Sequence, residues 1–175
     1  MPGINFFEYA RDEHVVEGIS SFGICDEPGE NPAFISYDRN EHTWIATVKN
    51  PGQKRIQFLP VDKYIPLVRH DGTDAMRCDA MLLTCPLGVR EAIIFIELKD
   101  VKQSAWENAR RHALDQLKET IEAFSEYHQL EGYKKRLAYV ANRKPYANRA
   151  HTSDIQKFRS DYRITLKFAS EIIFE

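Results

Sequence analysis

Asp79, Glu97 and Lys99 have the residue types and spacing that metal-assisted hydrolysis requires. Glu97 and Lys99 follow the apolar run 92–96, whose β-branched and aromatic residues are typical of a buried strand. Because side chains alternate along a strand, Glu97 and Lys99 share one face. Asp79 lies in a second candidate strand upstream, residues 77–84. Two carboxylates brought together can ligate a divalent cation, and a lysine beside them can position or deprotonate a water molecule.

The spacing of these two segments favours a hairpin that places the acids opposite each other. Segment 85–90 joins them and contains a proline and Gly88, which are typical of a turn. In a hairpin folded about Gly88, Asp79 and Glu97 are equally distant from the bend, so their Cβ atoms would lie roughly 4.5–5.5 Å apart. The carbonyl of Leu98 is a further candidate oxygen ligand. A register slip of one residue would instead place the carboxylates on opposite faces.

The alternative reading of Glu97 and Lys99 is a simple ion pair at the end of a strand. Buried charge in an apolar strand is unfavourable unless it is paired, and a third charge, Asp79, lies level with this pair. We therefore favour a functional site. A second Asp-x-Lys sequence, Asp100–Lys102, follows directly, but no apolar run precedes it closely enough to bury it.

A long amphipathic helix is predicted after the Glu97 strand. Ser104 begins a capping-box pattern, and apolar residues recur at helical spacing to about His128. His112, Gln116 and Thr120 follow one another at intervals of four residues. They are expected to form a polar strip beside the apolar face of this helix.

These segments carry a resemblance to a known family. Arg77–Asp79 and Phe95–Lys99, with Gln116 and Thr120 on the following helix, resemble the PD-(D/E)xK nuclease superfamily, and within it a subgroup of small proteins. The detailed resemblance covers about 50 residues. Cys78 stands where the motif has proline, and Thr120 stands where some members have the tyrosine of a Gln-x-x-x-Tyr signature. The resemblance implies an α/β fold with a restriction endonuclease-like core (αβββαβ), a central mixed β-sheet flanked by helices, in one domain over residues 1–175.

The resemblance also implies a function, the metal-dependent hydrolysis of phosphodiester bonds in nucleic acid, with DNA favoured. The cofactor would be Mg²⁺, with Mn²⁺ as the alternative. The implied catalytic residues are Asp79, Glu97, Lys99 and Gln116. The Gln116 amide would hold the lysine, a water molecule or a phosphate oxygen, and its structural alternative is a solvent-facing helix residue.

The expected metal ligands are Asp79, Glu97, the Leu98 carbonyl and an acid from the first helix. A first helix is predicted from Asn5 to about Gly18, because Asn5 and Glu8 form a capping-box pattern before an apolar side. Three acids on it are candidates for the additional ligand: Glu8, Glu13 and Glu17. We place Glu17 ahead, since Glu8 already has a capping role.

The remaining segments predict a mixed fold. Three short strands, 33–37, 42–49 and 54–59, are separated by turn-like segments and are expected to form an antiparallel meander. Residues 136–142 predict a strand that follows the long helix and should run parallel to the Glu97 strand. A short helix over 154–162 and strand-like runs at 164–168 and 172–174 complete the chain.

Composition favours a soluble protein with a real core. The chain has 175 residues, 29% of them charged, and no apolar run approaches the roughly 20 residues that span a bilayer. The N-terminus lacks the layout of a signal peptide, so we expect a cytoplasmic location. Three cysteines without Cys-x-x-Cys spacing favour neither a disulfide framework nor a zinc site. A homodimer is a reasonable expectation, because cutting both strands of a duplex often needs two sites.

Charge is distributed unevenly although the net charge is only −2. Residues 134–167 contain ten basic residues against Asp154 and Asp161, whereas residues 1–30 contain seven acids against Arg11. A basic segment of this kind can bind a phosphate backbone, and the alternative is a solvated face. Two other functions stay open: an inactive module of the same fold that binds nucleic acid or a protein, and a metal-dependent hydrolase of a smaller phosphoester.

Overall fold

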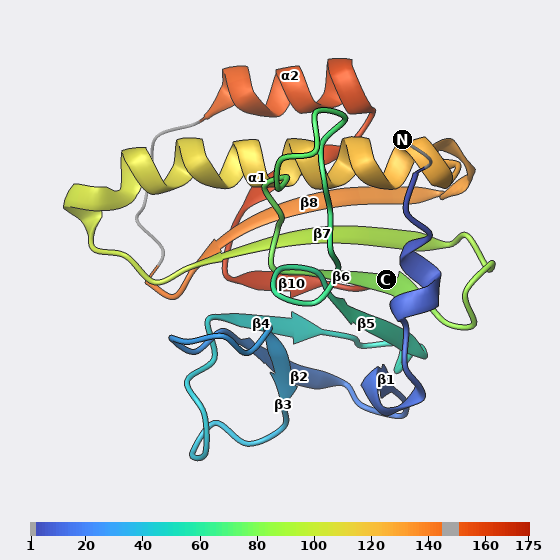
Figure 1. Ribbon diagram of the computed structural model, residues 1–175. Coiled ribbons are helices and arrows are strands. Elements are labelled where there is room, and N and C mark those ends of the chain that lie inside the picture. The colour runs from blue at the N-terminus through green and yellow to red at the C-terminus, as the bar shows by residue number, and fades with distance from the viewer. Residues whose placement is uncertain (1–2, 145–150) are drawn as a thin grey trace.

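The computed structural model describes residues 3–144 and 151–175, which form two β-sheets and a helical layer (Figure 1). The larger sheet has the strand order β1-β5-β6-β7-β8-β9 and the smaller one β10-β4-β2-β3. The strands of the larger sheet are β1 (Val15–Val16), β5 (Ile56–Pro60), β6 (Ala80–Thr84), β7 (Ala92–Lys99), β8 (Lys135–Asn142) and β9 (Thr165–Phe168). Those of the smaller sheet are β2 (Ser21–Cys25), β3 (Phe34–Ser36), β4 (Ala46–Lys49) and β10 (Glu171–Ile173). The helices are α1 (Trp106–Tyr127) and α2 (Thr152–Tyr162), with short 3-10 turns η1 (Phe6–Tyr9), η2 (Asp12–His14), η3 (Gln103–Ala105) and η4 (Leu130–Gly132).

The hairpin predicted about Gly88 forms in the predicted register. β6 and β7 are antiparallel, with Ala80 opposite Ile96 and Leu83 opposite Ile93. Gly88 has a φ of 102°, a conformation that favours glycine and lets the chain reverse. Asp79 is the residue immediately before β6, so continuing the same register places it opposite Glu97.

Alternation along β7 divides the hydrophobic core into two layers. Ile93 and Phe95 pack on the side of α1, whereas Ile94, Ile96 and Leu98 pack against the smaller sheet. Both faces of β7 are therefore covered, and this explains why its sequence is apolar without interruption up to residue 96. Glu97 falls on the α1 side of the strand.

The crossover from β7 through α1 to β8 agrees with the prediction. β8 runs parallel to β7, with Glu97 beside Val140, and α1 lies over these two strands (Figure 1). The predicted capping box does not form at the start of α1. The turn η3 precedes the helix instead. Ala105 is the N-cap of α1, and its side chain makes no capping hydrogen bond.

The predicted first helix is wrong. Asn5 caps as expected, since its side chain accepts a hydrogen bond from the Phe7 amide, but only the short turns η1 and η2 follow. Phe6 belongs to the core under α1, whereas Val16 belongs to the core between the sheets. The segment must pass from one face of the larger sheet to the other, and a continuous helix would not serve both cores.

The predicted antiparallel meander is also wrong. Its strands are present, but β3 and β4 both pair with β2, which was not predicted, and β5 belongs to the larger sheet. β2 escapes detection because its sequence, Ser-Phe-Gly-Ile-Cys, is short and contains Gly23 at its centre. At the other end of the chain, β9 joins β8 and β10 joins β4, each in parallel.

No helix in the part of the chain described is long and apolar enough to cross a membrane.

Gly23 is needed because the indole ring of Trp44 packs directly on its Cα. A Cβ added at position 23 would overlap that ring, whose other side carries the Arg39 guanidinium 4.4 Å from the ring centroid. We expect Gly23→Ala to lower the free energy of unfolding by about 1–3 kcal/mol, because the added Cβ would force the Trp44 ring away from β2. Denaturant unfolding measures the change. Gly52→Ala is the control, since a Cβ there would meet nothing closer than 3.6 Å and should change stability by less than about 0.5 kcal/mol.

Candidate active site

Two carboxyl groups meet where the β6–β7 hairpin reaches the end of the larger sheet. Asp79 and Glu97 are 7% and 1% exposed, so both are buried although each lies near an end of its strand. The amide of Leu98 donates a 2.6 Å hydrogen bond to Asp79 Oδ2, which holds the Asp79 carboxyl against β7. The N–H and C=O of a strand residue point to the same side, so the Leu98 carbonyl also faces Asp79.

Lys99 completes the group and is held by two partners. Its Nζ donates to Glu97 Oε1 at 2.5 Å and to Gln116 Oε1 at 2.9 Å. The amide nitrogen of Gln116 in turn donates to the Arg77 carbonyl at 3.0 Å. Gln116 therefore links α1 to the segment before β6 and fixes the position of the lysine, which is one of the three roles that the resemblance implied for its amide.

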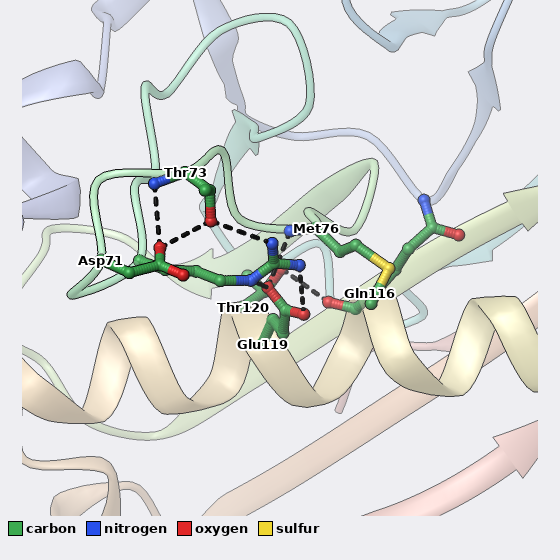
Figure 2. A network of polar contacts seen from close by, with 7 residues as sticks. Asp71, Thr73, Met76, Gln116, Glu119 and Thr120 are labelled. Carbon is green, nitrogen blue, oxygen red and sulfur yellow. Dashed lines mark hydrogen bonds and ion pairs between the residues drawn. The ribbon is translucent and has the colours of Figure 1, made fainter.

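Thr120 lies one helical turn beyond Gln116 and is fully buried, so the predicted polar strip beside the apolar face passes from exposed His112 through half-buried Gln116 into the core. Its hydroxyl accepts a 2.8 Å hydrogen bond from the Cys78 amide and donates to the Gln116 carbonyl at 2.9 Å. Figure 2 shows the hydrogen bond from the Thr120 hydroxyl to the Gln116 carbonyl, one turn back along α1. The backbone amide of Cys78, which a proline at this position would lack, therefore has a defined partner.

Replacing Thr120 by valine should destabilise the protein by about 1–3 kcal/mol, because the buried Cys78 N–H would lose its acceptor while the packing volume is kept. Unfolding in denaturant checks this value. Thr165→Val, at an exposed position of β9, is the matched control and should stay within about 0.5 kcal/mol of the wild type. Equal stability of the two variants would contradict the structural role of the Thr120 hydroxyl.

The loop before β6 is anchored to α1 by Glu119 (Figure 2). Glu119 accepts a 2.8 Å hydrogen bond from the Met76 amide, and both of its oxygens contact the Arg69 guanidinium. Asp71 accepts from the amide and hydroxyl of Thr73 within the same loop. The chain therefore enters the site strand from a fixed position.

Burial makes ionisation of the two acids costly. Burial raises the pKa of Asp79 to about 7, and the negative charges of Asp26 and Asp62 add to this, while the Leu98 amide and Lys99 oppose it. Burial, followed by the charge of Asp79, raises the pKa of Glu97 well above its ordinary value, and Lys99 opposes both effects. One lysine does not compensate two buried carboxylates, so a further positive charge at this point would be stabilising.

A divalent cation fits this arrangement. Glu97 Oε2 is buried and accepts no hydrogen bond from an amide, hydroxyl or ammonium donor among the described residues. Its polar neighbour is the Asp79 carboxyl, so either a proton shared by the two acids or a cation would satisfy this oxygen. Asp79, Glu97 and the Leu98 carbonyl supply the hard oxygen ligands that Mg²⁺ prefers. Within residues 3–144 and 151–175, no cluster of three or more His, Cys, Asp or Glu side chains is arranged to bind a metal, so water or substrate oxygens would complete the coordination.

The structure does not bring Glu17 to this site. Glu17 is exposed and lies 3.7 Å from Arg55, just after β1. Val16 pairs with Ile56, which pairs with Thr84, at the end of β6 that is remote from Asp79. The prediction of Glu17 as a metal ligand is therefore wrong, because the first helix on which it rested does not form.

Glu8 and Glu13 do not replace Glu17. Glu8 accepts a hydrogen bond from the Asn5 side chain, and Glu13 lies beside His14, with 3.8 Å between Oε1 and Nε2. Both belong to the 3-10 turns that stand in place of the predicted helix.

Asp26 and Asp62 are acids near the site that sequence reasoning missed. Asp26 follows β2 and Asp62 follows β5, and the charges of both raise the pKa of Asp79. Burial in turn raises the pKa of Asp26, and its electrostatic partners include Lys99. The available signal was the short apolar segment 21–25 that precedes Asp26. Without β2, Asp26 falls in a segment whose proline, glycine and asparagine residues predict a loop.

Comparison with protein-family models, curated proteins and solved structures gave no significant match.

Among the described residues, basic side chains of the C-terminal third lie at both ends of β8, so these do not form one cluster. Lys134 and Lys135 lie at the start of β8, the end remote from Lys99, where they pair with Glu91 and the C-terminal Glu175. Arg143 follows the other end of β8 and contacts Asp100 at 2.8 Å. Arg149, which counts toward the predicted basic segment, lies outside the described residues.

Proposed function

We propose that this protein is a Mg²⁺- or Mn²⁺-dependent phosphodiesterase that hydrolyses nucleic acid, with DNA as the favoured substrate. One observation carries the proposal: Asp79, Glu97 and Lys99 converge at the end of a sheet, with a buried Glu97 oxygen that accepts no hydrogen bond from an amide, hydroxyl or ammonium donor among the described residues. Two buried acids and a positioned lysine are costly to maintain for stability alone. Such pairs of strongly perturbed groups are concentrated at functional sites.

The order of the elements supports a restriction endonuclease-like core. Strands β5, β6 and β7 are successive and antiparallel, α1 follows, and β8 returns parallel to β7. This order matches the βββαβ part of the αβββαβ arrangement. The leading helix is represented here only by the 3-10 turns η1 and η2.

Each residue has a defined task in this mechanism. The bound ion would be held by Asp79, Glu97 and the Leu98 carbonyl, and it would acidify water and neutralise charge on the phosphate. Lys99 would orient the attacking water and add positive charge beside the phosphoryl oxygens. Gln116 would keep the Lys99 ammonium in place through its 2.9 Å contact. Deprotonation of Asp79 is required before it can bind an ion.

Metal binding and hydrolysis should be measured separately. Titration with Mn²⁺, followed by electron paramagnetic resonance, should show a site in the wild type that Asp79→Asn weakens strongly. Plasmid, single-stranded, branched and RNA substrates should then be tested with Mg²⁺ and with Mn²⁺. Metal binding without cleavage of any substrate would oppose the proposal and favour an inactive module, and cleavage unaffected by chelation would oppose the assignment of the site.

A further inference from the structure

A cavity of about 630 Å³ lies beside the candidate active site. Its walls come from η2, the segment around β3, the end of β5 and the turn after it. Its volume is within the range of roughly 300–1,000 Å³ that is typical of small-molecule sites. The proposed mechanism makes no use of it.

The cavity adjoins the carboxylates through the backbone. Pro60 lines it and pairs with Ala80, and the next amide, Val61, donates to the Asp79 carbonyl at 2.9 Å. Neighbouring strand backbones are roughly 4.8 Å apart. Phe58 and Ala80 face the core between the sheets, whereas Asp79 and Glu97 lie on the α1 side, so a bound strand would pass over the end of the larger sheet to reach both the cavity and the carboxylates. On the opposite wall, Glu27 directly follows Asp26, whose charge acts on Asp79. A nucleotide step advances about 3.4 Å along a DNA strand, so a base within a few positions of the scissile bond can reach the cavity.

The lining combines aromatic rings with acidic groups. Phe34, Tyr37, Phe58 and Tyr64 all contribute to it, and Tyr37 is 56% exposed although it is a large aromatic residue. Flat rings of this kind stack on bases of any sequence. His14 also lines the cavity, and its buried Nδ1 has no hydrogen-bond partner within the described part of the chain.

The charge of the lining decides which part of a nucleotide enters. Glu13 and Glu27 both line the cavity, and none of its lining residues within 3–144 and 151–175 is a lysine or arginine. Carboxylates repel phosphate but accept hydrogen bonds from exocyclic amino groups, such as N4 of cytosine. A neutral base that carries an amino group complements this lining, whereas the phosphate would remain with Lys99.

We propose that this cavity binds an unpaired, amino-bearing nucleobase of the substrate strand, next to the scissile phosphate. The inference rests on the proposed phosphodiesterase function and adds its substrate class, a single-stranded or locally unpaired strand. Unpairing is required because a base inside a duplex cannot present its Watson–Crick edge and both of its faces to such a cavity.

Binding of short, fluorescently labelled single strands, measured by anisotropy in EDTA, tests the inference without cleavage. The wild type should bind oligo-dC about tenfold more tightly than oligo-dT, because only cytosine offers an amino group to the carboxylates. Tyr37→Ala should weaken oligo-dC binding about tenfold through lost stacking. Glu27→Gln should reduce the preference for dC over dT. Tyr127→Ala is the matched control, because this α1 tyrosine is similarly exposed, at 54%, and should bind like the wild type.

The possible results separate this inference from the proposed function. Wild-type binding by Tyr37→Ala, or no binding of either oligonucleotide, would overturn the nucleobase site even if metal-dependent cleavage is observed. If the variants lose oligonucleotide binding as expected but the wild type cleaves nothing with Mg²⁺ or Mn²⁺, the nucleobase site would be supported and the proposed phosphodiesterase activity would be opposed. A Tyr37→Ala variant that changes only the oligomeric mass in light scattering would identify the surface as a contact between copies of the chain and overturn the inference.

Discussion

Glu97→Gln should reduce metal-dependent hydrolysis by at least about 10³-fold, the loss typical when a principal electrostatic group is removed from an active site. Glutamine has nearly the same volume as glutamate, so packing at the end of β7 is kept. The neutral amide removes the charge that would hold the ion, and it also removes the buried oxygen that accepts no hydrogen bond from an amide, hydroxyl or ammonium donor among the described residues. The value of kcat/KM at saturating Mg²⁺ measures the effect. Lys99→Met should show a loss of comparable size, because it removes the ammonium while keeping most of the side chain.

The chain contains a matched control for these variants. Asp100 and Lys102 repeat the acid-x-lysine spacing immediately after β7, but both are exposed, and Asp100 contacts Arg143. Asp100→Asn and Lys102→Met should retain hydrolysis within a few fold of the wild type. If Asp100→Asn and Lys102→Met lose as much hydrolysis as the Glu97 and Lys99 variants, the assignment of the site to the end of β7 would be contradicted.

The metal-free protein should lose stability as the pH rises from about 4 to above 7. The pKa of Asp79 is near 3.8 in the unfolded chain and about 7 in the folded protein. Between these pH values the folded state therefore binds more protons than the unfolded state. Stability therefore falls with rising pH in this window, and the full cost for Asp79, at about 1.4 kcal/mol per pH unit, is roughly 4 kcal/mol. The raised pKa of Glu97 acts in the same direction.

Denaturant unfolding in EDTA at pH 5 and pH 8 measures this loss. Added Mg²⁺ should restore stability at pH 8, where the carboxylates are ionised, and have little effect at pH 5, where they hold protons. Asp79→Asn should flatten the pH dependence, because the variant side chain does not titrate. Stability that rises between pH 5 and pH 8 in the metal-free wild type would contradict the raised pKa of Asp79.

The geometry of the central hairpin could be predicted because it depends on local features. A turn centred on Gly88 and alternation along two apolar segments fix the register, and the register alone places Asp79 opposite Glu97. The helical spacing placed Gln116 beside the apolar face of α1, but its contact with Lys99 was only one of three roles that the resemblance implied. These contacts span few residues in sequence, so periodicity and turn chemistry carry enough information.

The surroundings of the site could not be predicted because they depend on distant pairings. β2 is recognisable only through its neighbours β3 and β4, and without it Asp26 appears to be a loop residue. Glu17 was favoured because local patterns suggested one long helix, whereas two separate cores divide that segment between the faces of the sheet. Tertiary packing overrode local propensity in both cases.

Gln116 and Thr120, one turn apart on α1, together hold the ends of β6 and β7 in position. Gln116 contacts Lys99 at the end of β7, and both residues contact the backbone just before β6. A displacement of α1 along its own axis would break all of these contacts at once. Substitutions beneath the helix, for example at Leu117, would then shift Lys99 and the backbone before Asp79 relative to each other, so the proposed hydrolysis should be sensitive to the packing of the core under α1.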